Sequence, residues 1–162
     1  MDCITIQQLS QSSKGYLSEG YYLAYCDSQI ELALAYEKNS SYSFALVRYI
    51  EAFRYSLLGF QSKSSYSMAL RDDFKTLRPQ PVINTVALKR IKSIIELQKI
   101  SWHDFSTIFK EHSLKHPMPF VIFTTDDYLD IIKYYYNNDT NSIELLIKYA
   151  VCDFCSSLET EE

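Results

Sequence analysis

The chain has 162 residues, a length that fits one domain able to bury roughly two-thirds of its unfolded surface. With 47% hydrophobic and 22% charged residues and a formal net charge of −4, its composition is globular and excludes a disordered chain. Only three glycines occur, which excludes Walker and Rossmann phosphate-binding fingerprints, and no long apolar run or signal peptide is visible. We therefore expect a single helical domain over residues 1–162, located in the cytoplasm.

The N-terminal part of the chain predicts a helical hairpin. Residues 1–15 are polar, and a short helix and a flexible arm both stay open there. A long helix is expected from about Ser18 to Lys38, followed by a polar turn and a second helix that runs toward Phe60. The inner positions recur at three- and four-residue steps: Ile30, Leu32, Ala33, Leu34, Tyr36, Ala45, Leu46, Tyr49, Ala52, Phe53 and Leu57. Because small alanines opposite tyrosines favour close helix packing, Ala45 and Ala52 are predicted to be buried.

Part of this hairpin, residues 29–60, resembles a single tetratricopeptide repeat. The positions that carry the resemblance are Leu32, Ala33, Tyr36, Tyr42, Ala45, Leu46, Tyr49 and Ala52. The chain departs from the motif at Gln29, Ala33 and Leu57, where the motif favours tryptophan, glycine and proline, and it has no second copy at that period. The hairpin is also similar to the first two helices of HEPN domains, which often carry an Arg-x4-6-His ribonuclease motif. That motif is absent from this chain.

Two pairs of prolines divide the rest of the chain. A short helix is expected over 66–74, and after the first pair, Pro79 and Pro81, an apolar stripe predicts a helix over 83–98. The next helix begins at Ser101, which with Asp104 looks like a capping box.

The second proline pair, Pro117 and Pro119, precedes the apolar run 120–123, where a buried extended segment and a helical turn both stay open. A capped helix through Tyr136 with Asp126 and Asp127 near its start, a last helix over 143–158 and an acidic tail at 159–162 complete the chain. The expected fold class is all-α, a compact bundle of five to seven helices around the Ala/Tyr-rich hairpin.

The chain contains few groups that predict chemistry. Cys152 and Cys155 have redox or zinc spacing, but they fall inside a predicted helix without a second ligand pair. We expect them to be reduced, metal-free and structural. His103, His112 and His116 are expected at the surface or at a helix C-cap, because a proline follows the third. No catalytic, cofactor-binding or metal-binding residue is predicted, so the chain is not expected to be an enzyme.

Charge is distributed unevenly along the chain, with net −1 over residues 1–70, +4 over 71–99 and −7 over 100–162. The basic helix 83–99 is therefore predicted to meet an acidic protein surface, either a partner's or the chain's own C-terminal third. Nucleic acid is an unfavoured partner because the whole chain is acidic. The candidate partner-binding residues are Lys89, Arg90, Lys92, Tyr134 and Tyr135.

The function expected from these observations is non-catalytic binding of another protein, as an adaptor, a secretion or assembly chaperone, or a neutraliser of its partner. The alternative is the one that the second resemblance implies, a HEPN-like protein that acts on RNA or an inactive relative of one. The identity of the partner and the oligomeric state stay open.

Overall fold

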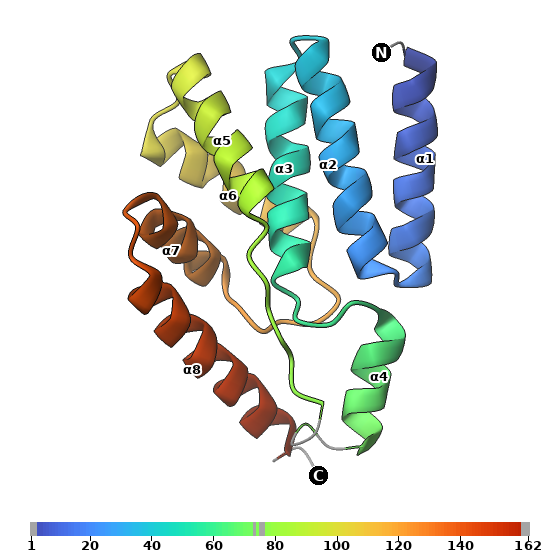
Figure 1. Ribbon diagram of the computed structural model, residues 1–162, viewed down its shortest axis with the longest axis vertical. Helices are drawn as coiled ribbons and strands as arrows, with labels where there is room; N and C mark the ends of the chain where they lie inside the picture. Colours follow the sequence, from blue (N-terminus) through green and yellow to red (C-terminus); the bar gives the residue numbers. More distant parts are fainter. Residues whose placement is uncertain (1–2, 73, 75–76, 160–162) are drawn as a thin grey trace.

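The computed structural model describes residues 3–72, 74 and 77–159 (Figure 1). These residues form eight α-helices and no strand, which confirms the all-α class and gives one helix more than expected. The helices are α1 (Cys3–Glu19), α2 (Tyr22–Lys38), α3 (Tyr42–Ser56), α4 (Lys63–Asp72), α5 (Thr85–Gln98), α6 (Trp102–Lys115), α7 (Thr125–Tyr136) and α8 (Thr140–Glu159). In Figure 1, α1, α2 and α3 stand side by side, and α5 lies on the other side of α3.

The predicted continuous helix from Ser18 to Lys38 is wrong, because the chain turns between α1 and α2. The main-chain N–H groups of Gly20 and Tyr21 donate to Leu17 O at 3.1 Å and Tyr16 O at 2.8 Å, the two bonds of a Schellman motif. Gly20 has φ +78°, a backbone conformation that favours glycine. The residues before this turn form α1, so the described part of the N-terminal segment is helical.

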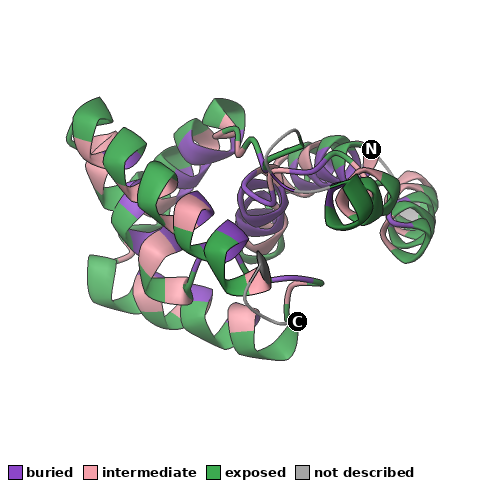
Figure 2. Cartoon of the chain, turned by 90° about the horizontal axis from the view of Figure 1, so that it is seen from below, coloured by how far each residue is buried: buried purple, intermediate pink, exposed green. Residues whose placement is uncertain are grey.

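The hairpin of α2 and α3 is the centre of the fold. Ala45 and Ala52 are fully buried, as predicted. Seven consecutive residues of α3, from Tyr49 to Tyr55, are buried, because α2, α5 and α6 all pack against this helix. Leu34 was expected on the inner face of the hairpin, but it is exposed beside α5. Figure 2 shows that buried residues gather toward the middle of the molecule and exposed residues on its outside.

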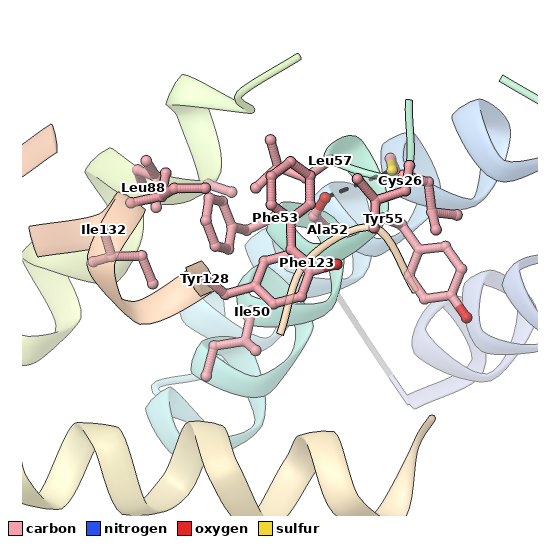
Figure 3. Packing of buried hydrophobic residues seen from close by; sticks show 14 of the residues in the cluster. Cys26, Ile50, Ala52, Phe53, Tyr55, Leu57, Leu88, Phe123, Tyr128 and Ile132 are labelled. Carbon is pink, nitrogen blue, oxygen red and sulfur yellow. Dashed lines mark hydrogen bonds between the residues drawn. The ribbon is translucent and has the colours of Figure 1, made fainter. Parts of the chain in front are cut away.

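Aromatic side chains connect α3 to the C-terminal helices. Between centroids, the ring of Phe53 lies 6.5 Å from that of Phe109 on α6 and 5.9 Å from that of Tyr128 on α7. Figure 3 shows Phe53 and Tyr128 in this core. Edge-to-face contacts of this kind add about 0.5–1.5 kcal/mol beyond the area that they bury. The abundant tyrosines therefore contribute substantially to the core.

The apolar run 120–123 is a bent connection between α6 and α7, and it forms neither strand nor helix. Phe120, Ile122 and Phe123 are buried, and the ring of Phe120 stacks on that of Tyr66 from α4 at 4.2 Å between centroids. These three side chains fill the space between α4 and the C-terminal helices, whereas Val121 is exposed.

The predicted starts of α6 and α7 are confirmed by their caps. Thr124 and Asp127 form a reciprocal capping box at the start of α7. Ser101 accepts a hydrogen bond from Asp104 N at 3.1 Å at the start of α6. None of the described helices combines the length and apolar character that crossing a membrane requires.

Candidate functional site

A groove with a volume of about 600 Å³ lies at the end of the hairpin away from its turn. Residues from the first two turns of α2, from α4 and from the segment 77–84 form its walls, and residues at the end of α3 and just after it form its floor. We call it the basal groove and define it by six of its apolar lining residues: Leu23, Tyr55, Phe60, Met68, Leu77 and Val82. A volume of this size is within the range of ligand and peptide pockets, roughly 300–1,000 Å³.

Hydrogen bonds from alternate main-chain N–H groups hold the wall at 77–84 in place. Three N–H groups donate to the last turn of α3 and the residues after it: Gln80 to Gly59 O at 2.9 Å, Val82 to Ser56 O at 3.2 Å, and Asn84 to Ser56 Oγ at 3.3 Å. Pro79 and Pro81, the residues on either side of Gln80, carry no N–H. Gln80, Val82 and Asn84 line the groove, whereas Pro79, Pro81 and Ile83 do not, and Pro79 is buried. This alternation is that of an extended chain.

Close contact between two segments fixes the position of this wall. Gly59 has φ +82°, and a Cβ atom added there would lie 2.7 Å from the Cβ atom of Pro79. Only glycine allows the chain after α3 to approach the proline so closely. The segment 77–84 is therefore clamped to α3 and is not a free loop.

The basal groove is bordered by exposed apolar side chains. We call residues 77–84 the proline segment. Leu23 on α2 is 54% exposed, Met68 on α4 44% and Val82 on the proline segment 67%. Asp27 from α2 and Arg78 from the proline segment add one charge of each sign on different walls. An apolar hollow with a few charged groups at its walls is typical of a surface that binds a partner.

A second groove, of about 420 Å³, lies at the turn of the hairpin, at the opposite end of α2 and α3. We call it the tip groove and define it by Leu34, Lys38, Tyr42, Arg90, Ser93 and Leu97. At its base, Glu37 accepts two hydrogen bonds from the Arg90 guanidinium, at 2.5 and 3.1 Å, and one from the Tyr49 hydroxyl. The hydrogen bonds to Glu37 raise the pKa of Arg90 above its usual value.

The five candidate partner-binding residues lie on two helices, α5 and α7. Lys89 is exposed and Arg90 half-buried beside the tip groove, whereas the ammonium of Lys92 lies over the ring of Tyr136, 5.6 Å from its centroid. Tyr134 and Tyr135 are half-buried and pack against the core.

The ion pair of α5 bears on one of the two acidic surfaces that were expected to meet this helix, the chain's own C-terminal third. Among the ion pairs of the described residues, that of α5 joins Arg90 to Glu37 on α2, and none joins α5 to the acidic C-terminal third.

A buried polar network that the sequence analysis missed lies in the middle of the fold. Glu51 on α3 accepts hydrogen bonds from the Tyr25 hydroxyl at 2.7 Å and from Nη1 of Arg54 at 2.7 Å. Nε2 of His112 on α6 lies 3.0 Å from the same carboxylate, and Nη2 of Arg54 donates to His116 O at 2.6 Å. The network joins α2, α3 and α6, and neither groove is lined by these side chains.

The hydrogen-bonding pattern of this network indicates a structural role. Buried charges are tolerated when they are paired and hydrogen-bonded, as Glu51 is on both carboxylate oxygens. The charged residues of α3, namely Arg48, Glu51 and Arg54, recur every three residues in an otherwise apolar stretch. That spacing was the available signal, because ionisable groups on the buried side of a helix require partners.

The histidine prediction is partly wrong. His112 is buried because its ring is paired with Glu51, whereas it was expected at the surface. His116 is the exposed C-cap residue of α6, as expected, and its ring lies 4.6 Å from that of His112. Burial and the neighbouring His112 lower the pKa of His116. No group of three potential metal ligands is found in the part of the chain that the structure describes.

The cysteine pair lies inside α8, as predicted. Cys155 is buried and Cys152 half-buried, and both are free thiols. Nη2 of Arg78 lies 3.8 Å from Sγ of Cys152, which brings α8 next to the proline segment.

Comparison of the chain with protein-family models, with curated proteins and with solved structures gives no match in any of the three. The interpretation of the two grooves therefore depends on their own geometry and chemistry.

Proposed function

We propose that this protein is a non-catalytic protein-binding module that holds an apolar segment of a partner protein in the basal groove. The observation that carries the proposal is the ring of exposed apolar side chains, Leu23, Met68 and Val82, around a preformed hollow. Burying such side chains on association contributes about 25 cal/mol for each Å² removed from water. Aromatic residues at the floor, Tyr55 and Phe60, give the apolar contact a rigid base.

The proline segment favours a helical partner segment over an extended one. An extended peptide binds a sheet-like edge through main-chain hydrogen bonds, which need free donors and acceptors on that edge. Alternate N–H groups of residues 80–84 are already bonded to α3 and the residues after it, and Pro79 and Pro81 have none to offer. A helix satisfies its own main chain and needs only side-chain contacts. The proposed occupant is therefore an amphipathic helix, with a cation that pairs with Asp27 and a carboxylate that pairs with Arg78.

An adaptor, a secretion or assembly chaperone and a partner neutraliser all use such a groove, and the proposal covers these three roles. We place the protein in the cytoplasm as part of the same proposal. Its support is that Cys26, Cys152 and Cys155 are free thiols, as is usual in a reducing compartment. No observation on the grooves favours the alternative role on RNA.

The test is site-specific photo-crosslinking in the cell that produces the protein. A benzophenone amino acid is placed at Val82 in one variant and at Met68 in another, both of which border the basal groove. The control variant carries it at Leu114 on α6, which is 84% exposed and lies outside both grooves. We expect the same discrete adduct, identified by mass spectrometry, from the two groove positions and not from Leu114.

The crosslinked segment of the partner is then mapped by peptide sequencing. A segment with apolar residues at helical spacing supports the proposal in full. Equal labelling from all three positions, or no adduct from either groove position, contradicts the assignment of the basal groove as the docking site.

A further inference from the structure

We propose that the tip groove is a second docking site, which binds an acidic amphipathic helix of another protein. It is formed by the turn of the hairpin and one face of α5, and it shares no lining residue with the basal groove. The proposal is independent of the function proposed above, because different side chains carry it.

Apolar side chains lie on both walls of the tip groove. Leu34 projects from α2 and Leu97 from α5, and they are 39% and 58% exposed. Tyr42 and Ile94 complete the apolar lining. Leucines on facing helices, separated by a hollow of about 420 Å³, leave room for the apolar side chains of a third helix.

The charged half of the groove is basic. Lys38 lies on the α2 wall, and Lys89 lies one turn before Ser93 on the flank of the α5 wall, where the Ser93 hydroxyl donates to Lys89 O at 3.1 Å. Both lysines are exposed. Among the described residues, neither takes part in an ion pair.

The acidic residue of the groove does not cancel these two charges. Both carboxylate oxygens of Glu37 are engaged, by Arg90 and by the Tyr49 hydroxyl. Glu37 and Arg90 neutralise each other, which leaves the charge of Lys38 on the lining of the groove and that of Lys89 on its flank. Carboxylates on the partner complement this charge and steer its association.

The same observations disfavour a nucleic acid as the occupant. Single-stranded nucleic acids bind along a continuous row of cations with aromatic rings that stack on the bases. Here one lysine, Lys38, is part of the leucine-lined hollow and a second, Lys89, lies on its flank, so the two do not form a continuous row. An acidic protein segment matches both the leucines and the lysines.

The position of the two grooves gives the proposal a consequence. Their lining residues lie toward opposite ends of α2, and the nearest of them, Asp27 and Leu34, are about 10 Å apart along the helix at 1.5 Å per residue. The proposal therefore implies that two partner helices can be bound at the same time, which is the property of an adaptor.

The probes are two synthetic helical peptides with the same leucine spacing, one with glutamates and one with lysines on the polar face. Binding of each to the full chain is measured by fluorescence anisotropy at low and at physiological salt. We expect the glutamate peptide to bind and to weaken as salt rises, because screening reduces charge contacts at the surface. The lysine peptide is expected to bind at least about tenfold more weakly, because it lacks the two partly screened charge contacts that the glutamate peptide makes with Lys38 and Lys89.

Charge reversal locates the binding surface. In the double variant Lys38→Glu/Lys89→Glu, affinity for the glutamate peptide should fall about tenfold and affinity for the lysine peptide should rise. The matched control is Lys110→Glu/Lys115→Glu on α6, which changes the net charge equally and lies outside the groove. The control should leave both affinities unchanged. Leu97→Ser should weaken both peptides, since they share the leucines.

Circular dichroism of each variant verifies that the fold is kept, since all the reversed lysines are exposed. The proposal is overturned if neither peptide binds, if both bind equally, or if the control variant has the same effect as the groove variant. It is also overturned if a single-stranded RNA oligonucleotide binds more tightly than the glutamate peptide and loses its affinity in the groove variant.

Discussion

The Nε2 atom of His112 lies 3.0 Å from the Oε1 atom of Glu51, and this contact joins helices whose contacting residues are 61 positions apart in sequence. Glu51 is 4% exposed and sits between α2 and α6, where it also accepts from Tyr25 and Arg54. Removal of one member of such a group leaves the others buried without a partner, which is strongly destabilising. The stability of the fold should therefore depend on this one carboxylate.

We predict that Glu51→Gln lowers the free energy of unfolding at neutral pH by about 3 kcal/mol. Burial alone would raise the pKa of Glu51, but the hydrogen bond from His112, the charge of Arg54 and the Tyr25 hydroxyl outweigh it. Together they lower the pKa from 4.5 to about 2. Because the pKa is lower in the folded state, ionised Glu51 stabilises the fold above pH 4.5, and this contribution is lost as the pH falls from about 4.5 to about 2.

Urea unfolding at several pH values measures this difference. The gap in stability between the natural chain and the Glu51→Gln variant should shrink across that window. Glu31→Gln, on the exposed side of α2, removes the same charge and should have no such effect. A gap that stays constant down to pH 2 would show that Glu51 is not ionised in the folded protein.

Two glycine substitutions should change stability in opposite directions. Gly59→Ala places a Cβ atom 2.7 Å from Pro79 at a residue with φ +82°, and we expect a loss of about 1–2 kcal/mol or more. Gly15→Ala in the middle of α1 meets no atom within 4 Å and should stabilise the helix by up to about 1 kcal/mol. Thermal melting of the two variants gives the answer. If Gly59→Ala melts like the natural chain, the proline segment is not clamped to α3.

The cysteines should differ in reactivity. Burial raises the pKa of the Cys26 thiol to about 12, and this thiol donates to Ala52 O at 3.6 Å, so it should resist alkylation at pH 8. Cys152 is half-buried and should react first, whereas Cys155 is buried. Mass spectrometry of a Cys3→Ser variant after timed alkylation measures the order.

The purified natural chain should contain no stoichiometric metal, because Cys152 and Cys155 are expected to be reduced and metal-free. Elemental analysis that finds one zinc per chain, lost in Cys155→Ser, would contradict it.

The features that the sequence predicted are local ones. The starts of α6 and α7 follow from Ser101 and Thr124, because a capping residue and its partner are three positions apart. Burial of Ala45 and Ala52 follows from helical periodicity within one hairpin. The missed break between α1 and α2 was also local, since Gly20 marks it, but a glycine inside an apolar pattern can be tolerated by a helix.

The features that could not be predicted depend on which segments meet in space. His112 is buried because α6 packs on α3, and nothing within α6 itself indicates Glu51 as its partner. The basal groove exists because the proline segment returns to Gly59, and the tip groove because α5 lies against the turn of the hairpin. The uneven distribution of charge along the sequence correctly indicated that α5 is a basic helix. It did not indicate that Glu37 on α2 would neutralise the charge of Arg90.

The way in which α1 packs determines how easily this helix separates from the rest of the fold. Ser13 is its one buried side chain among described residues 4–19, and the Ser28 hydroxyl and the Gln29 amide both donate to its hydroxyl. Few apolar groups therefore hold α1 to α2, in contrast to α3, which is enclosed by its neighbours. Free energies of local opening are lowest where little apolar surface is buried. Amide hydrogens of α1 should exchange with solvent well before those of α3, so the N-terminal helix can detach transiently while the rest of the protein stays folded.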